Sequence, residues 1–330
     1  MAKKDDLEEE LGRLADLRRL SDQGQVPEEQ VRRELSKALA EKRAPLVAKA
    51  ANLVETMALD GFRGDLEQAF FRLLPDPLKR DKGCVGKTAI AQALLELDES
   101  ADSVFLAGLS HIQLEPSWGP PVDTAANLRG FCAHGLVRAM HPDAVLHVTA
   151  LLVDKELPAR LGAVRALGES GQSAAEALLR LKVLTGDEEP EVIGETFSTL
   201  MSLSPERSLD FVAPFLDHAD PLLVESAALA LGGSRRPEVI EPLRARLDTA
   251  LKDEAQQPLY LALSLTRLDE ALDLLVDTVA DGPIGRARHA LSALKLHYFK
   301  QDLRERLAPR VAERGDAKLS EIWQEHFGDD

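Results

Sequence analysis

The segment Ser110–Thr124 (SHIQLEPSWGPPVDT) holds the side chains of this sequence best suited to binding another molecule. It carries one aromatic and four polar candidates: His111, Gln113, Glu115, Trp118 and Asp123. One glycine and two prolines directly after the tryptophan restrict the backbone, and an ordered loop with convergent polar groups can form a binding pocket. The alternative is that Trp118 covers an apolar gap between helices while the polar groups bond the loop backbone. We interpret the loop as a partner-binding site.

The helix predicted after this loop adds a polar stripe. At 100° per residue its apolar positions share one side, namely Leu128, Cys132 and Leu136. The opposite side carries Asn127, His134 and Arg138. We expect this stripe to belong to the same partner-binding region, and the alternative is an ordinary solvated helix face.

Arg129 lies at the boundary between these two faces. A guanidinium can hold a carboxylate through two parallel hydrogen bonds, so Arg129 is expected to orient Glu115 or Asp123. Trp and Arg are enriched among the residues that dominate binding energies. Trp118 and Arg129 are therefore the two side chains expected to matter most for a partner.

A zinc site needs three or four closely placed His, Cys or carboxylate ligands. The chain offers the right ligand types in Cys84, His111, Cys132 and His134. However, Cys132 and His134 lie two positions apart on a helix and diverge by about 160°. Cys84 lies in an apolar helical segment, where a free Cys is commonly buried for packing. We predict no metal site and no cofactor.

Two short motifs resemble those of enzymes without fulfilling them. Asp81–Thr88 (DKGCVGKT) has Asp where the phosphate-binding loop GxxxxGK[ST] needs Gly, and it fits instead as the start of a helix. Ser110, in GLSHI, lacks the second Gly of a nucleophile elbow. The nearby basic residues Lys79, Arg80, Lys82 and Lys87 are expected to form a solvated turn and helix start. We predict no catalytic residues.

Repeated helices are expected to position all of these side chains. The 330-residue chain is 45% hydrophobic but only 4% aromatic, so its core must consist mainly of Leu, Ala and Val, as in packed helices, with essentially no sheet. Aspartates recur in steps of 33 residues, at Asp154, Asp187, Asp220 and Asp253. Stacked helical hairpins have a period near this value. An Asp in each turn can accept hydrogen bonds from the first N–H groups of the next helix.

These turns and helices resemble the HEAT family, particularly its bacterial branch of phycobilisome-lyase-like repeats. In that branch an Asp turn precedes a helix with Val-Arg, paired Ala and Leu-Gly. The best matches here are AVRALG at 163–168 after Asp154, and Val224 to Gly232 after Asp220. With degenerate copies, the resemblance covers about residues 44–310.

The resemblance implies an all-α, right-handed α-solenoid of about seven or eight helical hairpins, whose second helices line a concave surface. Among HEAT enzymes, deoxyhypusine hydroxylase binds iron through repeated His-Glu pairs. This sequence contains no His-Glu dipeptide, so the resemblance does not extend to that activity.

Three segments are expected along the chain. Residues 1–43 form a charged helical hairpin that caps the array, with a break at 21–27 (SDQGQVP) and a second helix that continues to Asp60 and Gly61. Residues 44–310 form the repeats with the loop insertion at 110–124, and residues 311–330 form a capping helix and tail.

Charge and hydropathy exclude several classes of partner. With 40 Lys and Arg against 56 Asp and Glu, the net charge of -16 argues against binding nucleic acid, which requires neutralising many phosphates. The most continuous apolar stretch, Ala144–Val153, is about half of the roughly 20 residues needed to cross a bilayer. We expect a cytoplasmic protein that does not engage membranes.

The sequence favours a non-catalytic scaffold that binds a protein or peptide of basic or mixed charge through its concave face and the 110–124 loop. The alternative is an enzyme or a small-ligand or metal-binding protein with a polar site around the same loop.

Overall fold

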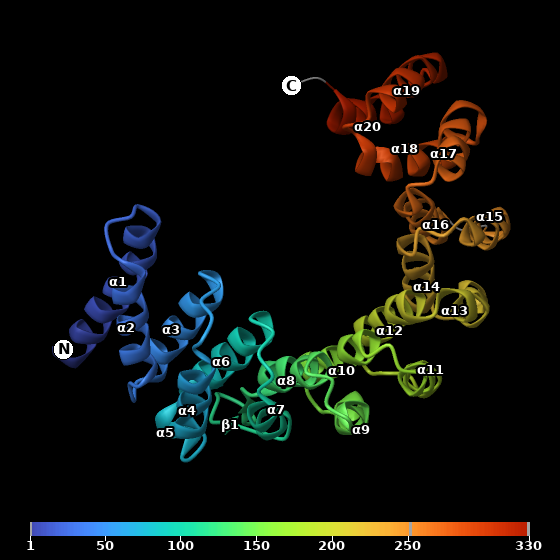
Figure 1. Ribbon diagram of the computed structural model, residues 1–330. Helices are drawn as coiled ribbons and strands as arrows, with labels where there is room; N and C mark the ends of the chain where they lie inside the picture. Colours follow the sequence, from blue (N-terminus) through green and yellow to red (C-terminus); the bar gives the residue numbers. More distant parts are fainter. Residues whose placement is uncertain (1, 251–252, 329–330) are drawn as a thin grey trace. The chain divides into compact units, whose positions relative to one another are not determined.

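The computed structural model shows a chain of stacked helices (Figure 1). It describes residues 2–250 and 253–328, and the side chains of residues 6–250 and 255–328. The chain divides into two compact units, Met1–Leu178 and Leu179–Asp330, each of which is described by itself. This division falls inside the 44–310 segment and does not coincide with the predicted segment boundaries.

The first unit consists of short helices in sequence. They are α1 (Ala2–Asp22), α2 (Glu28–Leu39), α3 (Ala44–Thr56), α4 (Arg63–Leu73), α5 (Pro77–Arg80), the 3₁₀ helix η1 (Lys82–Cys84), α6 (Val85–Glu96), α7 (Asp102–Leu109), α8 (Ala126–Arg138), α9 (Ala144–Thr149), η2 (Ala150–Val153) and α10 (Leu157–Glu169). Helix α3 packs on α6, α6 on α8 and α8 on α10, and we call this row and its counterpart in the second unit the inner helices. Helices α2, α4, α7 and α9 each pack against a helix of the row. Helix α11 (Ser173–Thr185) crosses into the second unit.

The second unit repeats the arrangement. Its helices are α12 (Pro190–Leu203), α13 (Pro205–Val212), η3 (Ala213–Asp217), α14 (Pro221–Gly233), η4 (Pro237–Val239), α15 (Ile240–Thr249), α16 (Asp253–Thr266), α17 (Asp269–Asp281), α18 (Ile284–Leu294), η5 (Lys295–His297), α19 (Gln301–Arg314) and α20 (Ala317–Phe327). Helices α12, α14, α16, α18 and α20 pack in that order, and α15, α17 and α19 pack beside them. The expectation of an all-α fold of stacked helical hairpins is confirmed.

The turn aspartates act as predicted only at Asp220. The Oδ1 atoms of Asp154, Asp187 and Asp220 each accept a hydrogen bond from the backbone N–H two residues later, at 2.9, 2.8 and 3.0 Å. The bond of Asp220 satisfies a donor in the first turn of α14, whereas the bonds of Asp154 and Asp187 end on Glu156 and Glu189, the residues directly before α10 and α12. The side chain of Asp253 lies outside the described residues.

The apolar face predicted for α8 is confirmed, since Leu128, Cys132 and Leu136 are completely buried. Glycines bring α8 and α10 unusually close together. A Cβ atom added at Gly162 would lie 2.5 Å from the Cα atom of Gly130. The small residues therefore set the spacing at which the next repeat docks.

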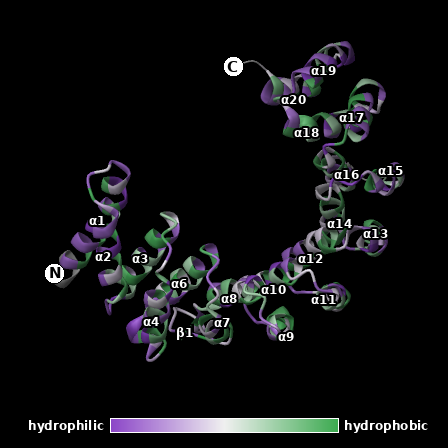
Figure 2. Ribbon diagram, viewed as in Figure 1, coloured by the Kyte–Doolittle hydropathy of each residue, from purple (hydrophilic) through white to green (hydrophobic). Residues whose placement is uncertain are grey.

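The second predicted helix, expected to continue to Asp60 and Gly61, is wrong in one respect. The structure ends α2 at Leu39 and starts α3 at Ala44. Pro45 lacks the N–H that a continuous helix would donate to the carbonyl of Glu41, so the chain breaks there and forms a tight pair of helices. Figure 2 shows that α1, before this pair, is mostly hydrophilic, although Leu14 and Leu17 are buried.

Strands are confined to one short ladder among the described residues. β1 (Leu114–Glu115) and β2 (Val122–Asp123) pair antiparallel within the 110–124 segment. The prediction of essentially no sheet therefore holds. The ladder joins the two arms of the 110–124 loop to each other. None of the described helices combines the length and the apolar composition needed to span a bilayer.

Candidate functional site

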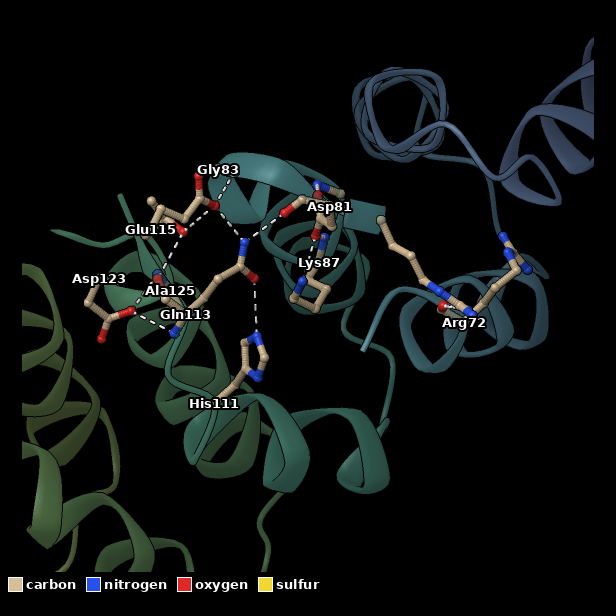
Figure 3. A network of polar contacts seen from close by, with 12 residues as sticks. Arg72, Asp81, Gly83, Lys87, His111, Gln113, Glu115, Asp123 and Ala125 are labelled. Carbon is tan, nitrogen blue, oxygen red and sulfur yellow. Dashed lines mark hydrogen bonds and ion pairs between the residues drawn. The ribbon is translucent and has the colours of Figure 1, made fainter. Parts of the chain in front are cut away.

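A network of buried polar groups connects the loop between α7 and α8 to the segment before α6 (Figure 3). Glu115 lies at its centre, and only 7% of this residue is exposed. Its Oε1 atom accepts hydrogen bonds from the backbone N–H of Gly83, from Nε2 of Gln113 at 2.7 Å and from Oγ1 of Thr124 at 3.0 Å. Burial alone would raise the pKa of Glu115, but these bonds outweigh it and hold that pKa below its usual value.

Gln113 connects the loop to the turn before α6. Its Nε2 atom also donates to the carbonyl of Asp81 at 2.7 Å, and its Oε1 atom lies 3.3 Å from Nε2 of His111. Burial of the half-buried His111 ring lowers its pKa, although the hydrogen bond with Gln113 acts in the opposite direction. The side-chain amide of Gln113 thus contacts His111, Glu115 and the backbone of Asp81 at the same time.

Arg129 ties the end of the loop to the next repeat. Its NH1 group donates to Oδ2 of Asp123 at 2.8 Å and to the carbonyl of His111 at 2.9 Å. Its Nε and NH2 groups form a bidentate pair with Asp154, at 2.8 and 2.9 Å. Arg129 therefore orients Asp123, as the sequence suggested, but its bidentate partner is Asp154 and not Glu115.

Both carboxylate oxygens of Asp123 accept hydrogen bonds. Its Oδ1 atom accepts the backbone N–H groups of Gln113 and Ala125, each at 3.0 Å. Burial would raise the pKa of Asp123, whereas these two bonds and the Arg129 guanidinium lower it below the usual value. Asp123 and Arg129 are both buried, so their role in this conformation is to position the loop and the start of α8.

Asp81 and Lys87 form a completely buried ion pair beside this network, with Nζ 2.8 Å from Oδ2. The carboxylate of Asp81 also accepts the backbone N–H groups of Gly86 at 2.8 Å and Lys87 at 3.0 Å, at the start of α6. The helix-start interpretation of this motif is confirmed. The expectation that Lys87 is solvated is wrong, because its charge is neutralised inside the protein.

The outer side of the loop is apolar. Ile112, Leu114 and Val122 are each more than half exposed, and the Trp118 side chain is fully exposed. The tryptophan therefore does not cover an apolar gap. The tip is shaped by Ser117, whose hydroxyl donates to the carbonyl of Pro120 and accepts the N–H of Gly119.

A groove of about 340 Å³ lies where this apolar side meets α5. Its apolar lining comes from Leu78, Ile112 and Leu114, and Asp76, Pro77, Lys79 and Gln113 complete it. We call the exposed residues Leu78, Ile112, Leu114, Trp118 and Val122 the loop surface. Sequence reasoning found the polar residues of the loop and Trp118 but missed Leu78, which becomes relevant only through the fold.

The polar stripe of α8 lies on the side of the helix that is in contact with solvent. Asn127 and Arg138 are exposed, and His134 is partly exposed. Nδ1 of His134 lies 3.1 Å from Oε2 of Glu169 on α10, and Nε of Arg138 lies 3.7 Å from the same oxygen. The stripe therefore contacts the neighbouring inner helix as well as solvent.

The four ligands considered for zinc do not gather into a metal-binding group among the described residues. Both cysteines are buried, which raises the pKa of Cys84 to about 11 and that of Cys132 further. Their thiols stay protonated at neutral pH and make poor metal ligands. The carboxylates of Glu115 and Asp123 already accept hydrogen bonds from other groups of the protein. A ligand or metal ion at these two side chains would have to replace those bonds.

One cluster of possible metal ligands does appear in the described part of the chain. It consists of His141, Asp143 and His147, whose donor atoms all lie within 4.8 Å of one another. The sequence analysis missed it. The signal available there is the spacing His-Pro-Asp followed four residues later by His, at a helix start.

Comparison with known proteins supports the repeat architecture. Residues 179–264 match the family of HEAT repeats. No curated protein matches the chain.

Solved structures similar to this chain include the complex of CpcE and CpcF of phycocyanin lyase from Nostoc sp. PCC7120, at 16% identity over 74% of this chain and 91% of that one, with a TM-score of 0.37. An engineered protein matches at 16% identity over 96% of this chain and 91% of its own, with a TM-score of 0.39. Human deoxyhypusine hydroxylase in complex with glycerol matches at 18% identity over 78% and 99%, with a TM-score of 0.31.

Proposed function

We propose that this HEAT-repeat chain is a non-catalytic protein-binding scaffold and that the loop surface binds an apolar segment of a partner protein. The observation that carries the proposal is the contrast between the two sides of the 110–124 loop. Its inner side is fixed by Gln113, Glu115 and Asp123, while its outer side presents Trp118 and three aliphatic side chains to water.

A prearranged apolar surface of this kind favours binding for two reasons. The partner gains the hydrophobic contribution of covering exposed side chains, about 25 cal/mol per Å² of apolar area. The loop loses little further conformational entropy, because its backbone is already held by buried hydrogen bonds. In this proposal Trp118 contributes contact energy, and Arg129 contributes by positioning the loop.

The charges that border the groove specify the partner further. The whole chain is acidic and predicts a basic or mixed-charge partner. Close to the groove, however, two cations, Lys79 and Lys82, and one carboxylate, Asp76, are exposed, whereas the carboxylates of Asp81 and Glu115 are buried, so positive charge predominates there. A segment with apolar side chains flanked by acidic ones fits these local charges best. The exposed members of the α8 stripe, Asn127 and Arg138, offer additional polar contacts.

Selection from a random peptide display library on the full-length protein tests this proposal. The selected peptides should be rich in apolar and acidic residues, and their Kd should rise at least tenfold in Trp118→Ala and in Leu114→Ser. Phe299→Ala is the matched control, since Phe299 is an exposed aromatic residue of the second unit. If these peptides bind both loop variants as tightly as the wild type, the partner site lies elsewhere.

A further inference from the structure

The turn between α8 and α9 brings three metal-ligating side chains together. They are His141, Asp143 and His147, and one donor atom from each lies within 4.8 Å of the other two. The two imidazole rings are 5.5 Å apart between centroids and are inclined at 61°. The cluster is separate from the loop surface and from the buried network beneath it.

The backbone of the turn fixes where the ligands start. Helix α8 ends with Met140 in the left-handed conformation, at φ 52°, and the N–H of His141 donates back to the carbonyl of Leu136 at 3.0 Å. This is the pattern of a closed helix C-terminus, so His141 leaves the helix in a defined direction. Pro142 then restricts both its own φ and the conformation of His141.

The other two ligands share one face of α9. The N–H of His147 donates to the carbonyl of Asp143 at 3.0 Å, which places the two residues one helical turn apart. Asp143 occupies the N-cap position, where Asp usually accepts a backbone hydrogen bond, but its side chain makes no capping bond. Its carboxylate instead stays with the two imidazoles.

We propose that His141, Asp143 and His147 bind a divalent transition-metal ion, with Zn²⁺ as the best-suited cation. Two imidazole nitrogens and one carboxylate oxygen form a ligand set that zinc accepts, with Zn–N distances of about 2.0–2.1 Å. Tetrahedral ligands at that distance are about 3.3 Å apart, so small rotations of the three side chains close the site. Nδ1 of His141 accepts a long bond of 3.2 Å from the Asp143 N–H, and coordination through this atom replaces that bond.

Three protein ligands leave the fourth position of a tetrahedral ion open to water or to a ligand from a partner. The inference does not depend on the loop surface, because none of the three ligands belongs to it. Metal binding would also fasten the short α9 helix to the end of α8, since the ligands come from both sides of the turn.

Isothermal titration of the metal-free, full-length protein with ZnCl₂ tests the site. The wild type should bind one zinc ion that Asp143→Asn and His147→Ala bind at least tenfold more weakly, while His134→Ala, a histidine paired with Glu169 elsewhere, behaves as the wild type. Far-ultraviolet circular dichroism confirms that each variant is folded, and Asp143→Asn is nearly isosteric at an exposed position.

The visible absorption of bound Co²⁺ provides a second measurement, because tetrahedral cobalt absorbs much more strongly than octahedral cobalt. The wild type should develop the tetrahedral spectrum and both ligand variants should lose it. Absence of zinc uptake by the wild type, or equal affinity in both variants, overturns the proposal. Peptide binding to the loop surface should be the same with and without zinc, which keeps the two proposals distinguishable.

Discussion

Arg129 and Asp154 join two successive repeats through a bidentate pair, with Nε to Oδ2 at 2.8 Å and NH2 to Oδ1 at 2.9 Å. The same Asp154 carboxylate accepts the N–H of Glu156 in the turn that leads into α10, while the same guanidinium holds Asp123 at the start of α8. A single arginine thus links the loop, its own helix and the following repeat.

Replacing Arg129 with Ala should lower the free energy of unfolding of the first unit by about 3–5 kcal/mol, because Asp123 would be left buried without its counter-charge. Urea unfolding followed by circular dichroism measures the loss. Arg138→Ala is the matched control on the same helix, since its side chain is 43% exposed and should contribute less than about 1 kcal/mol. A loss for Arg129→Ala as small as that of the control would contradict the linking role.

The buried pair of Asp81 and Lys87 should respond differently to single and double replacement. Lys87→Met leaves the Asp81 charge uncompensated in the interior and should cost about 3–5 kcal/mol of unfolding free energy. The double variant Asp81→Asn/Lys87→Met removes both charges and should recover most of that loss. Urea unfolding of the two single variants and the double variant gives the coupling, and additive losses would exclude a direct pair.

Acid should weaken the fold through Glu115 and Asp123. Both carboxyl groups have pKa values held below their usual ones in the folded protein, so their stabilisation is present above the unfolded pKa values and is lost as pH falls through the folded ones. The free energy of unfolding should therefore decline from about pH 5 downward. Glu115→Gln should flatten part of this decline, whereas Asp76→Asn, at an exposed position, should leave the profile unchanged. An identical profile for Glu115→Gln would show that its ionisation is not linked to folding.

Gly162 should tolerate no side chain. Alanine there places its Cβ atom 2.5 Å from the backbone of Gly130, so the two inner helices must separate at a cost of about 1–3 kcal/mol. Gly64→Ala is the control, because a Cβ atom at that helical position meets nothing within 4 Å. Thermal unfolding should give a clearly lower Tm for Gly162→Ala only, and equal Tm values would mean that the α8–α10 spacing can relax freely.

Local features were the predictable part of this fold. The turn aspartates Asp154, Asp187 and Asp220 each bond a backbone N–H two residues later, so their role in the turn follows from the nearby sequence alone. The apolar face of α8 follows from helical periodicity in the same way. The break before Pro45 was missed because the apolar spacing continues on both sides of it.

The candidate site was predictable only in part, because its partners come from distant repeats. Arg129 was expected to meet a loop carboxylate and does meet Asp123, six residues before it, but Asp154 lies 25 residues further on. Lys87 has the sequence surroundings of a solvated turn, and only the folded structure shows it buried beside Asp81. Which loop side chains are buried depends on contacts with a distant turn, where Glu115 accepts the N–H of Gly83 and Gln113 donates to the carbonyl of Asp81, and no sequence pattern indicated these contacts.

Fluorescence of Trp118 during partner binding is the most direct test of the scaffold proposal. The chain has two tryptophans, so Trp323→Phe leaves Trp118 as the single reporter. Trp118 is fully exposed in the free protein, and its emission should shift to shorter wavelength as a selected apolar, acid-flanked peptide saturates the loop surface. Saturable peptide binding with an unchanged Trp118 spectrum would contradict the proposal, because the ring would remain in water while the partner is bound.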